Sequence, residues 1–287
     1  MEITIGKTAG FCFGVRRAVE RSIEEVQKEK KQIYCLGELV HNNEVIKDLE
    51  KKGIKFIESI EEVKEEKAKV IVRAHGIEKE IYQKANKKGI ELIDCTCPNV
   101  LKTHELADEY QKKGFYIFLM GVANHPETIG TISYCGENKS LIVQKEDIEE
   151  AIKNLEKSKI KNVLVFAQTT YSIHKFEENI KIIKAQLKED IQITIKNTIC
   201  LTSEQRQKET EEISKQVDTM IIVGGKNSSN TKRLYDVSQK NCKNTILIET
   251  KDELTKDIKD NSKKIGIMLG NSTPQKSIEE VVKFLNS

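Results

Sequence analysis

The chain of 287 residues contains only three prolines and no proline-rich or glycine-rich stretch. No change in composition therefore marks a linker, and this length is compatible with one large domain or with two or three small ones. The chain also lacks an apolar run of 18 or more residues and a signal-peptide pattern at its start, where residues 1–5 have the composition of a strand. These absences argue against a membrane segment, and we expect a cytoplasmic protein.

An excess of charge of one sign is also missing. Charged residues make up 32% of the chain and hydrophobic residues 38%, and the net charge is only +3 with lysine and glutamate interspersed. This balance is typical of a soluble globular protein. Proteins that bind nucleic acid usually have a concentrated basic face, so we expect no nucleic acid and no membrane as a partner.

Seven cysteines are present, but the close pairs of a structural zinc site are not. There is no C-x₂-C or H-x₃-H pair, and Cys95 and Cys97 are the only cysteines close in sequence. In a cytoplasmic chain such cysteines are more often reduced thiols or metal ligands than disulfides. We expect Cys35, Cys135 and Cys242, which have no repeated counterpart, to be packing residues.

The other three cysteines, Cys12, Cys97 and Cys200, mark a repeat. Each follows a strand-like run and precedes a helix-like run, and a glycine stands 25, 24 and 24 residues later, respectively. Two further polar segments follow each cysteine. The first stands 28 or 29 residues later; the second stands 63 residues after Cys12 and 72 after Cys97 and Cys200, so the first repeat is shorter. The first set is His41-Asn42-Asn43, His125-Pro126-Glu127 and Asn227-Ser228-Ser229-Asn230, and the second is Arg73-Ala74-His75-Gly76, Gln168-Thr169-Thr170 and Gly270-Asn271-Ser272-Thr273-Pro274. The spacing predicts three repeats, at residues 1–97, 98–197 and 198–287.

Short apolar runs and longer amphipathic stretches alternate along the chain. The runs are about three to six residues long and contain β-branched residues, as in buried parallel strands. They cover residues 33–36, 70–72, 115–120, 163–166, 220–223 and 265–269. We expect a helix after each cysteine, with Pro98 at the first position of the second helix and Thr202 or Ser203 capping the third. This alternation predicts an α/β fold of three similar parallel-sheet domains about a pseudo-threefold axis.

Three thiols at one centre suit one kind of metal site better than others. A structural zinc ion takes four ligands, whereas a 4Fe–4S cluster held by three thiolates keeps one iron without a protein ligand. That open iron can bind a substrate oxygen as a Lewis acid. Each cysteine also lies at a predicted helix N-terminus, where the helix dipole favours thiolate. Cys12, Cys97 and Cys200 are therefore the candidate ligands of such a cluster.

The polar segments supply a candidate substrate site, because ligands of α/β proteins bind at the carboxyl ends of the strands. Histidine, serine and asparagine donors suit phosphate oxygens, and the candidates are His41, His75, His125, Ser228, Ser229, Asn230 and Ser272. Glu127 is the candidate proton donor, and Thr169 can relay a proton or position a hydroxyl. Taken singly, each of these residue types is also common in turns and helix caps.

Several motifs together resemble the 4-hydroxy-3-methylbut-2-enyl diphosphate reductases, the LytB-type iron–sulfur reductases, from near the first residue to near the last. They include Gly10-Phe11-Cys12-Phe13-Gly14-Val15, Leu39-Val40-His41-Asn42, Ala74-His75-Gly76, Thr96-Cys97-Pro98, Asn124-His125-Pro126-Glu127, Gln168-Thr169-Thr170, Ile199-Cys200, Gly225-Lys226-Asn227-Ser228-Ser229-Asn230 and Ser272-Thr273-Pro274. The resemblance implies a trefoil-like arrangement of three domains around a central iron–sulfur cluster. It also implies the last step of the non-mevalonate isoprenoid pathway, in which two electrons and two protons yield isopentenyl and dimethylallyl diphosphates.

The resemblance also assigns roles to individual residues. It implies Cys12, Cys97 and Cys200 as cluster ligands, and Glu127, Thr169 and His125 as catalytic residues. It implies contacts with the allylic diphosphate substrate by His41, His75, His125, Thr169, Ser228, Ser229, Asn230 and Ser272. An external electron donor such as ferredoxin or flavodoxin is expected, in keeping with the lack of a glycine-rich nucleotide-binding fingerprint.

One residue departs from the family pattern, which does not usually have a cysteine at the position of Cys95. Cys95 and Cys97 would point to the same face of an extended strand, but the repeat spacing favours Cys97 as the ligand. Two other functions use the same residues. An iron–sulfur hydro-lyase would remove a hydroxyl without net electrons, and a cysteine-based metal or redox sensor would bind a partner without turnover.

Overall fold

The computed structural model describes residues 1–29, 31–65, 67–255, 257–258 and 262–287. Its strands are β1 (Glu2–Ile5), β2 (Ile33–Leu36), β3 (Ile54–Ile57), β4 (Lys69–Val72), β5 (Glu91–Asp94), β6 (Tyr116–Met120), β7 (Lys139–Ile142), β8 (Asn162–Ala167), β9 (Gln192–Ile195), β10 (Thr219–Val223), β11 (Thr245–Ile248) and β12 (Lys264–Leu269). Its α-helices are α1 (Phe13–Lys28), α2 (Asn43–Lys51), α3 (Lys79–Lys87), α4 (Pro98–Lys112), α5 (Pro126–Ile132), α6 (Asp147–Ser158), α7 (Ile173–Gln186), α8 (Leu201–Ser214), α9 (Ser229–Gln239) and α11 (Lys276–Asn286). Two short 3₁₀ turns are η1 (Ile60–Glu62) and η2 (Lys251–Glu253).

The strands form three parallel four-stranded sheets with one common strand order. The orders are β3-β2-β4-β5, β7-β6-β8-β9 and β11-β10-β12-β1. The four strands of each sheet can be numbered in chain order, with β1 counted as the fourth strand of the third sheet. Across every sheet they then lie in the order second, first, third, fourth. The third sheet takes its fourth strand from the start of the chain, since Ile3 pairs with Ile265 and Ile5 with Ile267. The predicted α/β class with parallel sheets is confirmed.

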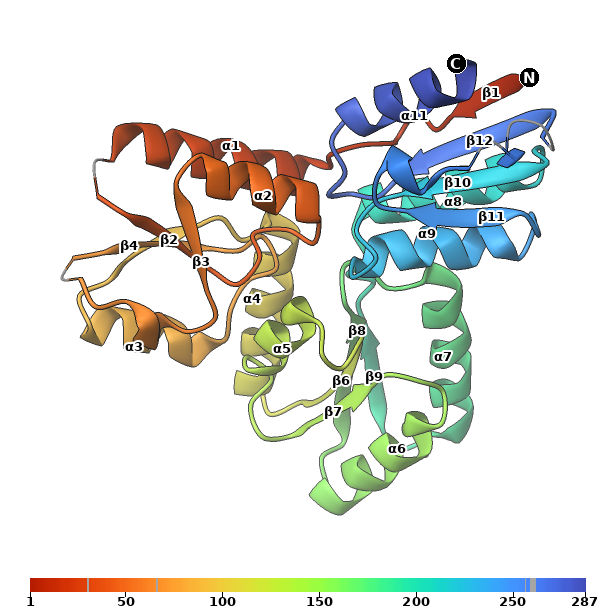
Figure 1. Cartoon of the computed structure of the whole chain (residues 1–287). Helices are drawn as coiled ribbons and strands as arrows, with labels where there is room; N and C mark the ends of the chain where they lie inside the picture. Colours follow the sequence, from red (N-terminus) through yellow and green to blue (C-terminus); the bar gives the residue numbers. More distant parts are fainter. Residues whose placement is uncertain (30, 66, 256, 259–261) are drawn as a thin grey trace. The chain divides into compact units, whose positions relative to one another are not determined.

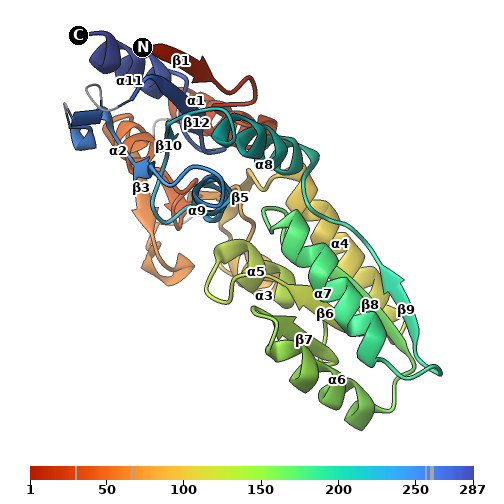
Figure 2. The ribbon, with the colours of Figure 1, turned by 90° about the vertical axis from the view of Figure 1, so that its right-hand side faces the viewer.

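The second sheet is covered by helices on both faces. Alternate residues of its central strands point to opposite sides, as the pleat of a strand requires. Phe118 and Val165 join a hydrophobic cluster with residues of α6 and α7, whereas Leu119 and Phe166 join a cluster with residues of α4. Figures 1 and 2 show α6 and α7 running along strands β6 and β8. Strands buried on both faces explain the continuous apolar runs in the sequence.

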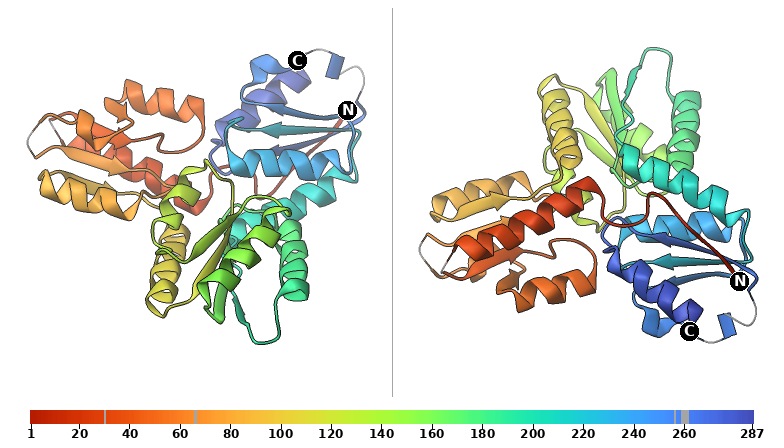
Figure 3. Two further views of the ribbon diagram at one scale, coloured as in Figure 1. Left: turned by 90° about the horizontal axis from the view of Figure 1, so that it is seen from below. Right: turned by 90° about the horizontal axis from the view of Figure 1, so that it is seen from above.

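The third sheet repeats this layering. Ile221 and Ile267 pack with residues of α11 on one face, and Ile222 and Met268 pack with residues of α8 and α9 on the other. Both ends of the chain lie beside this sheet (Figure 3). In the first sheet, the cluster on one face joins residues of β2 and β4 to Ala85 of α3.

The chain divides into two compact units. Unit 1 comprises Met1–Lys30, Glu38–Lys55 and Leu201–Ser287, and unit 2 comprises Lys31–Gly37 and Phe56–Cys200. Unit 1 contains the third sheet together with α1 and α2. Unit 2 contains the second sheet and most of the first.

The predicted helices after the cysteines are present, but one detail was wrong. Pro98 is the first residue of α4, as expected. Helix α8 begins at Leu201, so Thr202 and Ser203 lie inside it and neither caps it. Cys200 takes the position before the helix instead. In the described part of the chain, no helix has the length and apolar character needed to cross a bilayer.

Candidate active site

The three repeated cysteines occupy equivalent places in the fold. Each stands directly before a helix, at the starts of α1, α4 and α8. The backbone N–H of each also donates to a carbonyl in the turn after the third strand of a sheet. The acceptors are Asn271 for Cys12, Ala74 for Cys97 and Thr169 for Cys200, at N···O distances of 3.1, 2.9 and 2.8 Å. Each cysteine turn is therefore hydrogen-bonded to a late-strand turn, but to the one that precedes it in the series and not to the one that follows it at the repeat spacing.

Solvent access separates these cysteines from the other four. Cys12, Cys97 and Cys200 are partly exposed, whereas Cys35, Cys95, Cys135 and Cys242 are buried. Cys135 and Cys242 belong to hydrophobic clusters, as expected of packing residues. Burial raises the pKa of the Cys135 thiol to about 12 and that of Cys35 still further, which keeps both thiols protonated. A thiol that stays protonated is a poor metal ligand.

Cys95 is fully buried although it lies only two residues before Cys97. Its N–H continues the ladder of the first sheet by donating to the Val72 carbonyl at 3.2 Å. The next N–H, from Thr96, donates to the Asp94 side chain at 2.9 Å and turns the chain. Cys97 consequently lies outside the sheet, before the first turn of α4.

In unit 2, Glu127 and Thr169 form a buried pair. Glu127 is in the first turn of α5 and is 3% exposed. Its Oε1 accepts a hydrogen bond from the Thr169 N–H at 2.6 Å, and its Oε2 accepts one from the Thr169 hydroxyl at 2.9 Å. Because the Thr169 carbonyl accepts the N–H of Cys200, one residue joins the carboxyl group to a cysteine turn.

The Glu127 carboxyl has a pKa that allows it to bind and release a proton near neutral pH. Burial raises its pKa to about 7, and the two hydrogen bonds from Thr169 only partly oppose this rise. A carboxyl group with a pKa near the working pH can both hold and release a proton, which is the requirement for a general acid.

His125 and His75 lie beside this pair in unit 2. His125 is the N-cap of α5, and its Nδ1 accepts the Glu127 N–H at 3.1 Å. In the neutral ring this contact places the proton on Nε2. The ring of His75 packs edge-on against that of His125, with 5.4 Å between centroids. The structure thus brings together His75, His125, Glu127 and Thr169.

Unit 2 also brings Cys200 close to the turn that contains Cys97. The side-chain amide of Asn99, two residues after Cys97, donates to the Cys200 sulfur at 3.1 Å. Asn99 carries no signal in the sequence that would predict this contact, because an asparagine in the first turn of a helix is ordinarily a surface residue.

In unit 1, His41 is held between two chain segments. Its Nδ1 lies 2.9 Å from the Glu38 carboxylate, and its backbone carbonyl accepts the Ser272 hydroxyl at 2.9 Å. Gly225 approaches the same carbonyl so closely that a Cβ there would lie 2.4 Å from the oxygen. Two of the predicted residues, His41 and Ser272, are therefore adjacent, and a glycine permits the approach.

The start of α9 provides the other predicted residues of unit 1. Ser228 is the N-cap, and its hydroxyl accepts the Thr231 N–H at 3.3 Å. Ser229 and Asn230 are the first two helical residues. Asn230 is 3% exposed, and neither its Oδ1 nor its Nδ2 has a hydrogen-bond partner among the described residues. Since buried amides are nearly always hydrogen-bonded, this side chain is suited to contact a ligand.

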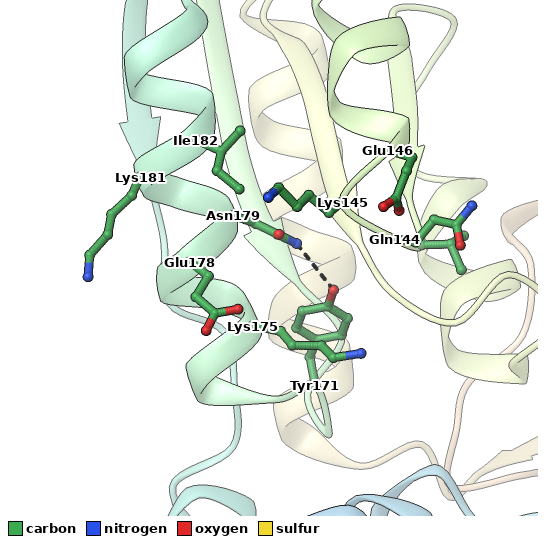
Figure 4. Close-up of a pocket in the computed structure, with 10 residues that line it drawn as sticks. Gln144, Lys145, Glu146, Tyr171, Lys175, Glu178, Asn179, Lys181 and Ile182 are labelled. Carbon is green, nitrogen blue, oxygen red and sulfur yellow. Dashed lines mark hydrogen bonds between the residues drawn. The ribbon is translucent and has the colours of Figure 1, made fainter.

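A separate pocket of about 450 Å³ lies between the end of β7 and helix α7 in unit 2. Its wall mixes lysines and glutamates, among them Lys145, Lys175 and Glu178 (Figure 4). Asn179 donates to the Tyr171 hydroxyl at 3.4 Å within it. The pocket contains none of the predicted site residues, and its charges of both signs do not define a ligand.

Comparison with known proteins identifies the family of the chain. The family model described as LytB protein matches residues 3–286. The chain belongs to the LytB family. A relative from Caldanaerobacter subterraneus subsp. tengcongensis, named 4-hydroxy-3-methylbut-2-enyl diphosphate reductase, is 43% identical over 289 residues, which cover 100% of this chain and 97% of the relative. A relative of the same name from Clostridioides difficile is 39% identical and is covered completely, as is this chain.

Solved structures give the same result. The E-1-hydroxy-2-methyl-but-2-enyl-4-diphosphate reductase of Plasmodium falciparum superposes with a TM-score of 0.90 at 31% identity, over 100% of this chain and 88% of that one. A structure of (E)-4-hydroxy-3-methyl-but-2-enyl diphosphate reductase, described as the terminal enzyme of the non-mevalonate pathway, gives a TM-score of 0.71 at 37% identity, over 100% and 99%. The family expected from the sequence motifs is confirmed, and the chain is an enzyme of this family of oxidoreductases.

Proposed function

We propose that this LytB-family chain removes the hydroxyl group of 4-hydroxy-3-methylbut-2-enyl diphosphate by reduction. In the reaction the C–O bond breaks, the hydroxyl leaves as water with one proton, and two electrons and a second proton enter the allyl group. The products are isopentenyl and dimethylallyl diphosphates. The observation that supports this best is the chain of contacts from Glu127 through Thr169 to Cys200, which couples a proton donor to a cysteine turn.

We propose that Cys12, Cys97 and Cys200 hold a 4Fe–4S cluster with one iron free of protein ligands. The chemistry of these residues fits the group. They are the partly exposed cysteines, and each precedes a helix whose positive N-terminal end would stabilise a negatively charged cluster. When bound, the cluster would supply electrons and a Lewis-acidic iron for the substrate hydroxyl.

Glu127 is the proposed proton donor, and Thr169 is its partner. With a pKa of about 7, a buried Glu127 holds its proton below neutral pH and in a large fraction of the molecules at pH 7, so it can act as a general acid. Thr169 fixes both carboxyl oxygens through its N–H and its hydroxyl. The hydrogen bond from the Glu127 N–H holds His125 in one orientation, so its Nε2–H can point to a substrate oxygen.

The residues at the start of α9 are the proposed diphosphate contacts. Free backbone N–H groups and the positive end of the dipole make such a helix start a site for phosphate. Asn230 and the serines 228 and 229 stand at that start, and Ser272 and His41 are joined to each other. Together with His75 and His125 of unit 2, they would supply the polar hydrogens that a diphosphate accepts. Ferredoxin or flavodoxin is the proposed electron donor.

An anaerobic assay with the reconstituted protein tests this function. Incubation with the allylic diphosphate and a chemical reductant should consume the substrate and produce both isoprenoid diphosphates. Consumption without reductant would instead identify a hydro-lyase. Reconstitution of a cluster with no consumption in either case would favour a sensor, and a wild-type chain that takes up no iron would contradict the proposed cofactor.

A further inference from the structure

Helix α8 carries a buried cation that the proposed reaction does not use. Arg206 lies in its second turn and is 2% exposed. One terminal nitrogen of its guanidinium donates to the Leu269 carbonyl at 3.0 Å. The other donates to the Gly10 carbonyl at 2.8 Å and also to the Thr8 carbonyl. The side chain therefore joins the end of β12 to the segment that leads into Cys12.

Glu209, one turn further along α8, binds the N–H groups of the same segment. Its carboxylate accepts the Lys7 N–H at 2.6 Å, the Thr8 N–H at 2.9 Å and the Thr8 hydroxyl at 2.5 Å. Partial burial would raise the pKa of Glu209, but the hydrogen bonds from Thr8 and Lys7 outweigh it and the pKa is lowered. The carboxylate is ionised at neutral pH, so its three bonds are charge-assisted.

A third residue of α8 completes the arrangement. The Ser203 hydroxyl accepts the side-chain amide of Asn271 at 3.2 Å, and the Asn271 carbonyl accepts the Cys12 N–H at 3.1 Å. Both segments that bracket Cys12, residues 7–10 before it and residues 269–271 beside it, are thus bonded to one helix.

The segment before Cys12 needs such support, because its own sequence does not define one conformation. Gly10 has φ +103, in the region that glycine alone adopts readily, and glycine is the most flexible residue when unfolded. A buried guanidinium adds little net stability compared with apolar packing, since its desolvation offsets its hydrogen bonds. Its directional bonds to three carbonyls, in contrast, restrict the positions that those carbonyls can take.

We propose that Arg206 and Glu209 are positioning residues for Cys12, holding residues 7–10 against the end of β12 so that the Cys12 thiol is presented in one place to iron. The inference rests on the proposed function in one respect, that Cys12 is a cluster ligand. It assigns to α8 a role in building the metal site that is separate from binding substrate.

The experiment compares four variants of the full-length chain: Arg206→Gln, Arg206→Lys, Glu209→Ala and the control Lys208→Ala. Lys208 lies on the same helix, is exposed, and forms an ion pair with Glu204 at 2.6 Å. Before cluster reconstitution, iodoacetamide alkylation of each cysteine is followed by mass spectrometry of its peptide. After reconstitution, the rate of iron loss to bathophenanthroline is measured.

Arg206→Gln and Glu209→Ala should speed alkylation of Cys12 by about tenfold, a change typical of losing hydrogen bonds to a charged group. Alkylation of Cys97 and Cys200 should stay within twofold of wild type, and iron loss should accelerate. Arg206→Lys, which keeps the charge but not the fork of donors, should fall between, and Lys208→Ala should match wild type.

Equal acceleration at all three cysteines, or no change at Cys12, would overturn the proposal, because either result means that α8 acts only on overall stability. If Arg206→Gln does not fold, Glu209→Ala and Arg206→Lys decide the outcome by the same criteria. A wild-type chain that binds no iron would contradict the proposed function. The alkylation ratio would still decide whether α8 positions Cys12.

Discussion

Two groups of site residues differ in how far the chain satisfies their polar atoms. In unit 2, both carboxyl oxygens of Glu127 accept hydrogen bonds from Thr169. In unit 1, the buried amide of Asn230 has no hydrogen-bond partner among the described residues. The Glu127 carboxyl oxygens thus have hydrogen-bond partners without any ligand, and burial raises the pKa of this carboxyl. The Asn230 amide keeps unmet hydrogen-bonding capacity, which costs stability until a ligand meets it. Proton transfer and ligand binding thus require opposite local designs.

The largest expected effect concerns Cys97, which lies in the same unit as Glu127. Cys97→Ser should abolish the visible absorption of the cluster, whereas Cys95→Ser should leave most of it, because Cys95 is buried within the end of the first sheet. Absorption spectra and iron content of the two purified variants measure this. The reverse outcome would show that Cys95, and not Cys97, is the cluster ligand.

The next effect concerns the carboxyl group itself. Glu127→Gln keeps the shape of the side chain but cannot give up a proton as an acid, so turnover should fall by about 100-fold or more. Iron content and substrate affinity should change little. In wild type, turnover should decline as the pH rises above about 7, since the carboxyl then ionises. Steady-state kinetics across pH 6–9 provide the test, and a variant with full turnover would exclude Glu127 as the acid.

The same carboxyl group should make folding stability depend on pH. Its pKa is raised from 4.5 in the unfolded chain to about 7 in the fold, so the folded state holds the proton more firmly. The associated stabilisation is complete below pH 4.5 and is lost as the pH rises to 7, with a total of roughly 3 kcal/mol. Urea unfolding of the ligand-free chain at pH 5 and pH 8 measures it. Glu127→Gln should remove this part of the difference; an unchanged difference would mean that the carboxyl is not shifted.

Asn230→Ala should weaken substrate binding without lowering the stability of the ligand-free chain. Without ligand, removing a buried amide that lacks partners should leave the melting temperature unchanged or raise it. With substrate, KM should rise by about tenfold, the cost of one hydrogen bond to a charged group. Thermal unfolding and kinetics on the same preparation provide both numbers. A large loss of stability with an unchanged KM would show that Asn230 is a structural residue.

The smallest expected effect concerns the close approach of Gly225 to the backbone of His41 in unit 1. In Gly225→Ala, the new Cβ would lie 2.4 Å from the His41 carbonyl oxygen, so one segment must shift. We expect KM to rise by a few-fold with kcat nearly unchanged, since the shift displaces His41 but not Glu127. His41→Ala should raise KM at least as much. An unchanged KM in both variants would remove His41 from the diphosphate contacts.

The central strands and the three cysteine turns could be predicted because both leave strong signals in the sequence. Strands β2, β4, β6, β8, β10 and β12 are buried on both faces and give continuous apolar runs. The edge strands other than β1 were not predicted, because many of their side chains are only partly buried and their apolar runs are interrupted by polar residues. Strand β5 has Glu91 at its start and Asp94 at its end, and β9 has Gln192 at its start.

Long-range arrangements left no local signal. The pairing of β1 with β12 joins the two ends of the chain and follows from neither strand alone. Thr202 and Ser203 have the side chains of caps, but Cys200 precedes the helix and Ser203 bonds to Asn271 instead. Arg206 and Glu209 belong to a helix that looks ordinary in sequence, and only the folded chain shows which backbone groups they hold.

The central claim is that three cysteines share one cluster with an open iron that meets the substrate. The most direct measurement is an anaerobic Mössbauer spectrum of the reconstituted chain, recorded with and without 4-hydroxy-3-methylbut-2-enyl diphosphate. We expect a four-iron spectrum in which the signal of about one iron in four shifts when substrate is added. A spectrum that shows no cluster, or one that the substrate leaves unchanged at saturating concentration, would contradict it.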